Sequence, residues 1–156
     1  MSDWFAAVDG AADARLYEVI EKTKDHSCLY TGEYDDDTKM ALPYLVRMTR
    51  GEHFAKLWSA SEGGRFWGIL CQTSLNMQQL RRHLRKFTTA RLPLGDVVLF
   101  RFWDPRVFVP FVENGTEEEI APFFKGIDSI IVDLGKQGRK KYIWNKGLKI
   151  GNLAAG

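Results

Sequence analysis

The sequence places an arginine and an aspartate where an ion pair could join a strand to a helix. Arg101 follows the apolar run 97–100, and Asp104 lies three residues further on. Because an isolated charge in apolar surroundings costs several kcal/mol, we expect Arg101 to be at least partly buried and bonded to a carboxylate. Asp104 is the favoured partner, with Asp9 or Asp133 as alternatives. On this hypothesis, Arg101→Ala leaves a buried carboxylate unpaired, at a cost of roughly 3–5 kcal/mol.

The same segment predicts a strand that leads directly into a helix. The nearly continuous apolar character of residues 97–102 is typical of a strand covered on both faces. Pro105 suits the first position of a helix, and the carboxylate of Asp104 can cap that helix. Trp103 and Arg106 flank this turn and are candidate partner-binding residues.

A second group of side chains could bind anions. Apolar residues at helical spacing predict a helix from about residue 74 to residue 87, with a stripe formed by Met77, Leu80, Leu84 and Phe87. Arg82, Arg85 and Lys86 face away from that stripe, where they could contact phosphates or an acidic protein surface. A solvated basic face that only keeps the helix soluble explains the pattern equally well.

The motifs of common enzymes are missing from the sequence. It has no glycine-rich phosphate-binding loop, no Gly-x-Ser-x-Gly and no His-Glu-x-x-His. The three histidines show no metal-ligand spacing, and the acidic loop 33–37 lacks the glycine and the closing glutamate of a calcium loop. We therefore expect a protein without catalytic activity, metal or cofactor.

Composition predicts one globular domain with an uneven distribution of charge. Of the 156 residues, 45% are apolar, which suffices for a hydrophobic core. Residues 1–80 carry 8 Lys and Arg against 12 Asp and Glu, whereas residues 81–156 carry 14 against 8. No apolar run approaches the roughly 20 residues that span a bilayer, and the first residues do not resemble a secretory signal. A cytoplasmic location follows as an expectation.

Apolar strand patterns alternate with helical patterns along the chain. This alternation predicts an α/β fold with a single domain, whose mixed, mainly parallel sheet is flanked by helices. The predicted domain covers residues 1–146, and the glycine-containing segment 147–156 is expected to be a flexible C-terminal tail.

Five sequence segments together resemble the adaptor, or chaperone, domain encoded beside type VI secretion spike genes. In order, they are Val8–Ala11, Ala41–Val46, Trp67–Gly68, Leu80–Phe87 and Leu99–Val107. The resemblance covers about residues 4–132. It implies a cytoplasmic protein without catalytic residues, which binds a secreted effector and loads it onto the valine-glycine-repeat spike protein.

Two other functions remain compatible with the residues. One is nucleic-acid binding through the basic helix 81–87 and exposed aromatic side chains; the other is a small hydrolase or transferase whose site only the fold would assemble. The resemblance favours an effector protein and a spike protein as partners, with no membrane and no nucleic acid. The candidate partner-binding residues are Arg82, Arg85, Lys86, Trp103 and Arg106, and the candidate structural motif is Arg101, Asp104 and Pro105.

Overall fold

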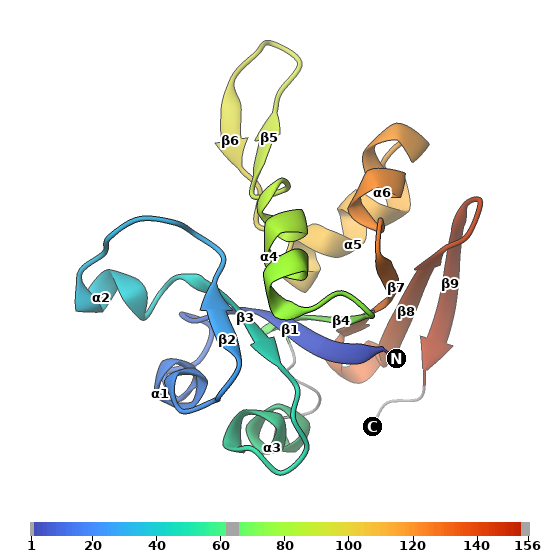
Figure 1. Cartoon of the computed structure of the whole chain (residues 1–156). Helices are drawn as coiled ribbons and strands as arrows, with labels where there is room; N and C mark the ends of the chain where they lie inside the picture. Colours follow the sequence, from blue (N-terminus) through green and yellow to red (C-terminus); the bar gives the residue numbers. More distant parts are fainter. Residues whose placement is uncertain (1, 62–65, 154–156) are drawn as a thin grey trace.

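A seven-stranded antiparallel sheet runs through the centre of the molecule (Figure 1). The computed structural model describes residues 2–61 and 66–153. In these residues the strand order is β2-β3-β1-β4-β7-β8-β9. The strands are β1 (Asp3–Asp9), β2 (His26–Cys28), β3 (Pro43–Arg47), β4 (Gly68–Thr73), β7 (Ile127–Asp133), β8 (Arg139–Trp144) and β9 (Leu148–Leu153).

The direction of the strands corrects the expected mainly parallel sheet. Every neighbouring pair is antiparallel: Phe5 of β1, for example, lies opposite Arg47 of β3 and Cys71 of β4. Helices cover both faces of the central strands, so these strands are apolar on both faces whatever their direction. A continuous apolar run therefore reports burial on two faces, and it does not distinguish parallel from antiparallel pairing.

Five helices cover the sheet, three on one face and two on the other (Figure 1). The first group comprises α4 (Met77–Arg85), α5 (Pro105–Asn114) and α6 (Glu117–Phe123), and the second comprises α1 (Leu16–Glu21) and α3 (His53–Ala60). Phe5 and Ala7 of β1 pack toward the first group, whereas Ala6 and Val8 pack toward the second. This alternation is the two-residue period of a strand with two buried faces.

Two short helical segments lie in connections rather than over the sheet. They are α2 (Asp36–Lys39), between β2 and β3, and the 3₁₀ turn η1 (Gly135–Gln137), between β7 and β8.

Aromatic rings fill the core beneath α5 and α6. Phe123 is completely buried at its centre, and its ring centroid lies 5.0–6.0 Å from those of Phe87, Phe102, Phe108, Phe111 and Phe124. Offset or edge-on contacts of this kind add about 0.5–1.5 kcal/mol each beyond the burial of area. This core holds α6 and the start of α5 in place against the sheet.

Two glycines allow backbones to approach closely in the segments that carry the family resemblance. A Cβ atom on Gly68 would overlap the carbonyl oxygen of Ala7, and one on Gly10 would lie 2.6 Å from that of Met40. No side chain fits at either position without movement of the backbone. The glycines at these positions are therefore required by packing.

A separate hairpin projects from the body beyond the end of α4 (Figure 1). It consists of β5 (Thr89–Arg91) and β6 (Val97–Leu99), which pair only with each other among the described residues. The expectation of a buried strand over 97–102 is wrong, because Val97 is 57% and Leu99 is 67% exposed. Phe100 is partly buried against Phe111, and Phe102 is the first residue after the hairpin that is completely buried.

The last described residues form part of the sheet. Leu148–Leu153, expected in a flexible tail, is strand β9, which pairs with β8 from Trp144↔Leu148 to Arg139↔Leu153. The rest of the predicted tail, residues 154–156, lies outside the described residues. Among the described residues, no helix combines the length and apolar character needed to cross a membrane.

Candidate functional site

Helix α4 presents an apolar stripe to the core and a basic face to solvent. Its first turn is closed by a capping box, in which the side chains of Asn76 and Gln79 each accept a hydrogen bond from the other's backbone N–H, at 2.9 and 3.0 Å. Leu80 and Leu84 are completely buried. The predicted stripe is confirmed, although the helix spans Met77–Arg85 and is shorter than expected.

The basic face of α4 borders a groove of about 550 Å³ beside the edge strand β2. The groove is lined by Ser27, Met77, Gln78, Arg81, Arg82 and Arg85. Arg81 donates from Nε to the carbonyl oxygen of Cys28 at 2.7 Å, and Arg85 donates from Nη2 to Oγ1 of Thr31 at 3.1 Å. Both acceptors are neutral, so these bonds orient the guanidinium groups without cancelling their charge. The groove is suited to carboxylate or phosphate groups.

The three basic residues singled out from the sequence lie where they were expected. Arg82, Arg85 and Lys86 are exposed on the outer side of the helix. Arg81 joins Arg82 and Arg85 in lining the groove. Its position at the border of the apolar stripe had hidden this role.

His83 lies on the inner side of the same helix. Its Nε2 atom lies 2.6 Å from the carbonyl oxygen of Phe123, and its ring packs edge-on against Phe87 at 5.2 Å. Burial lowers the pKa of His83; the hydrogen bond to the Phe123 carbonyl opposes this in part, and the charges of Lys86 and Lys125 lower the pKa further. A neutral imidazole that donates to the Phe123 carbonyl fits this environment. His83 therefore ties α4 to α6.

The turn before α5 forms as the sequence predicts. The carboxylate of Asp104 accepts the backbone N–H of Arg106 at 2.9 Å, and Pro105 occupies the first turn of the helix. Asp104 also accepts from the guanidinium of Arg106, at 3.0 Å from Nε and 2.9 Å from Nη2. The favoured pairing of Asp104 with Arg101 is therefore wrong, because Arg106 occupies the carboxylate.

Arg101 instead pairs with Asp9, one of the two alternative partners. This contact connects the segment after the hairpin with the end of β1. The Arg101 side chain is 52% exposed, whereas that of Asp9 is only 15% exposed. Because the guanidinium is half exposed and Asp9 also accepts the backbone N–H of Ala11, we expect Arg101→Ala to cost less than the loss of a fully buried pair.

The two remaining candidates, Trp103 and Arg106, differ in their exposure to solvent. Trp103 is 2% exposed and packs edge-on against Phe102 and Tyr30, so it is a core residue, and its candidacy as a partner-binding residue is wrong. Arg106 is exposed, and its guanidinium lies 5.8 Å from the ring centre of Phe66. Only Arg106 is placed to meet a partner.

Sequence reasoning missed the most exposed apolar surface of the described chain. Five large apolar residues of the β5–β6 hairpin are exposed, namely Leu92, Leu94, Val97, Val98 and Leu99. Leu94 at the tip is 95% exposed. Pro93 and Gly95 were the available signal, because turn residues in the middle of an apolar segment are typical of a hairpin.

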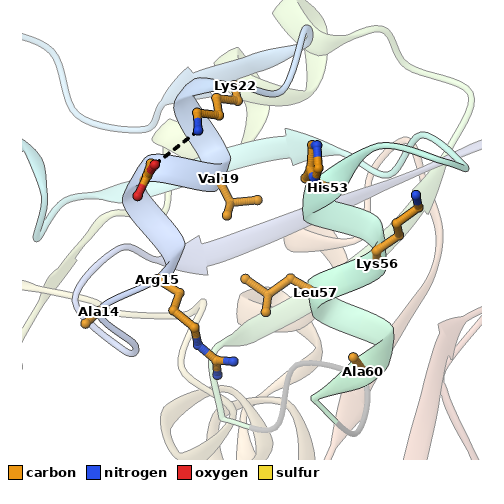
Figure 2. A pocket seen from close by; sticks show the side chains of 9 residues that line it. Ala14, Arg15, Val19, Lys22, His53, Lys56, Leu57 and Ala60 are labelled. Carbon is orange, nitrogen blue, oxygen red and sulfur yellow. Dashed lines mark hydrogen bonds and ion pairs between the residues drawn. The ribbon is translucent and has the colours of Figure 1, made fainter.

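A second groove, of about 620 Å³, lies between α1 and α3 on the opposite face of the sheet (Figure 2). Val19 and Leu57 point toward one another across it (Figure 2). Two of its cations are already paired with carboxylates: Arg15 with Asp13 at 2.9 Å, and Lys22 with Glu18 at 3.0 Å. The groove therefore attracts anions less than the α4 groove does.

The acidic loop between β2 and α2 has a structural role. Asp35 accepts the backbone N–H of Thr38 at 2.7 Å and caps α2. Among the described residues, no three His, Cys, Asp or Glu side chains gather as ligands of a metal ion.

Comparison with known proteins identifies the family of the chain. No curated protein and no solved structure matches it. A family model for a domain of unknown function, DUF4123, matches residues 4–121, and this range includes the α4 groove, the hairpin and the Asp104 turn. Since the match covers well over half of the sequence, the chain belongs to the family of the domain of unknown function DUF4123.

Proposed function

We propose that the protein is an adaptor that binds a type VI secretion effector and loads it onto the valine-glycine-repeat spike protein. The proposal rests on the ordered segments that resemble such adaptors, all of which lie within the range matched by the family model, residues 4–121. The protein would hold its cargo and not convert it, so it needs no cofactor. Loading precedes export, which puts this step in the cytoplasm.

One structural observation supports this proposal most directly. The β5–β6 hairpin, which carries the exposed apolar residues, projects from the body beyond the end of α4 (Figure 1), where Arg85 and Lys86 lie. Several large apolar side chains exposed on one short hairpin are typical of a site of protein–protein contact. The neighbouring arginines add positive charge, which would speed the encounter with an acidic partner.

The nucleic-acid alternative has less support. It needs aromatic side chains at the surface beside the basic helix, on which bases can stack. Trp103, its main candidate, is buried in the core. The arginines of the α4 groove alone would give only salt-dependent binding without sequence preference.

Co-expression and pull-down test the adaptor function. The tagged protein is co-expressed with the effector and the spike protein encoded beside its gene, and both are expected to be retained. The triple variant Arg82→Glu, Arg85→Glu, Lys86→Glu should retain less of an acidic partner. A control with the same change of charge is Lys24→Glu, Lys136→Glu, Lys149→Glu, whose three lysines are exposed elsewhere on the chain.

Two outcomes would contradict the adaptor function. If neither protein is retained, and if the effector stays soluble and is secreted normally without this chain, the adaptor function is wrong. Salt-dependent retention of the purified protein on DNA, lost in the triple variant, would support the nucleic-acid alternative instead.

A further inference from the structure

The β5–β6 hairpin is a two-stranded sheet to which no third strand is added in the part of the chain that the structure describes. A two-stranded hairpin is marginally stable in water unless another strand or a helix packs against it. Among the described residues, β6 pairs only with β5. Val97 and Leu99 are nevertheless more than half exposed, so much of their apolar surface lies in water.

The backbone of β6 is oriented to accept another strand. Phe100 donates its N–H to the carbonyl of Thr88 at 2.8 Å, and Leu92 donates to that of Asp96 at 2.7 Å. Inward and outward backbone groups alternate along an antiparallel pair. The N–H and C=O groups of Val97 and Leu99 therefore point away from β5, along the free edge.

The two edges of the hairpin differ in their protection. Natural sheets block free edges with charged side chains or with proline. The outer edge of β5 carries Arg91, and Pro93 follows soon after. The outer edge of β6 carries Val97 and Leu99, with no charge and no proline. The edge of β6 is therefore the one open to a partner.

The surrounding charge indicates what kind of segment would bind. Residues 81–101 contain six Lys and Arg and one acidic residue, Asp96. Arg91 lies directly opposite Val97 in the hairpin, and Arg85 and Lys86 lie at the end of α4, where the hairpin begins. A segment that carries acidic residues beside its apolar ones would complement this field.

We propose that the edge of β6 binds an extended apolar segment with flanking acidic residues from a partner protein, which adds to the hairpin as a third strand. Main-chain hydrogen bonds to Val97 and Leu99 would supply affinity, and every second side chain of the segment would pack on the exposed apolar face. This inference rests on the proposed adaptor function, since it assigns such a segment to the cargo.

Peptide binding to the full chain tests the inference. The probe is a short fluorescent peptide of alternating Val and Thr with Asp residues at both ends, measured by fluorescence anisotropy. The matched peptide with Lys in place of Asp should bind at least about tenfold more weakly, which corresponds to about 1.4 kcal/mol. A peptide with a central proline, which breaks the strand, should not bind.

Two variants locate the binding edge. Leu99→Pro removes an outward N–H and keeps the bonds to β5, so it should abolish binding. Val97→Thr with Leu99→Thr removes apolar surface without adding charge and should weaken binding, even if the proline variant fails to fold. The control is Ile150→Thr with Leu153→Thr on β9, where the apolar residues are also exposed at a sheet edge. It should bind like the original chain.

Three results would overturn the inference. They are equal binding of the Asp and Lys peptides, unchanged binding by the Val97 and Leu99 variant, and a dimer in sedimentation that the same variant abolishes. The test is separate from that of the adaptor function. If the peptide binds but neither effector nor spike protein is retained, only the adaptor function fails. If both are retained by the Val97 and Leu99 variant as well as by the original chain, only the strand-addition inference fails.

Discussion

Two triplets of apolar residues, 130–132 in β7 and 97–99 in β6, have similar compositions but opposite environments. Ile130 and Val132 of β7 are completely buried, whereas Val97 and Leu99 of β6 are more than half exposed. β7 lies between β4 and β8 with a helical layer over it, whereas β6 pairs with β5 alone among residues 2–61 and 66–153. An apolar run therefore indicates a strand, while the number of layers around that strand decides whether the strand becomes part of the core.

Truncating one residue in each triplet gives the largest expected contrast. Ile130→Ala should lower the free energy of unfolding by about 2–5 kcal/mol, because it opens a cavity in the core. Leu99→Ala should change it by no more than about 0.5 kcal/mol, since water already surrounds the side chain. Urea unfolding measures both values. Equal losses would show that the hairpin packs as part of the core.

Two strand glycines extend the contrast from side chains to the backbone. Gly68→Ala should destabilise the protein by about 1–3 kcal/mol, because its Cβ would overlap the carbonyl of Ala7 across the β1–β4 pair. Gly151→Ala in β9 is the control, since a Cβ atom added there would meet no heavy atom within 4 Å. Thermal unfolding should therefore separate the two variants. Similar midpoints would mean that β1 and β4 can shift apart at no cost.

Arg101 and Asp104, which flank the core residues 102–103, should also differ in how much they contribute to stability. Asp104→Ala removes the cap of α5 and should cost about 0.5–2 kcal/mol. Arg101→Ala removes a half-exposed guanidinium from Asp9, which keeps its hydrogen bond from the Ala11 N–H, and should cost no more than about 1 kcal/mol. Chemical unfolding of both variants checks this order. If Arg101→Ala lowered the free energy of unfolding more than Asp104→Ala, the result would support the buried ion pair expected from the sequence.

The smallest effect on stability is expected on the basic face of α4. The triple reversal at Arg82, Arg85 and Lys86 should leave the thermal midpoint nearly unchanged, because exposed charges contribute little each. The midpoint measured at low and at high salt provides the check. A marked loss of stability that salt restores would show that these charges hold the fold together.

Local features of this protein followed from the sequence alone. The cap formed by Asp104, the position of Pro105 and the apolar stripe of α4 were all predicted correctly. Each depends on residues a few positions apart, whose geometry a turn or a helix determines without help from the rest of the chain. The exposure of Arg82, Arg85 and Lys86 follows from the same helical period.

The tertiary structure decided the direction of the strands, the partner of Arg101 and the environments of Trp103 and the hairpin. Arg101 and Asp9 are 92 residues apart in the chain, and only the position of β1 brings them together. Apolar strands of either direction share one sequence pattern when both faces are covered. Burial depends on how many elements pack around a residue, which is a property of the whole fold and not of the segment itself.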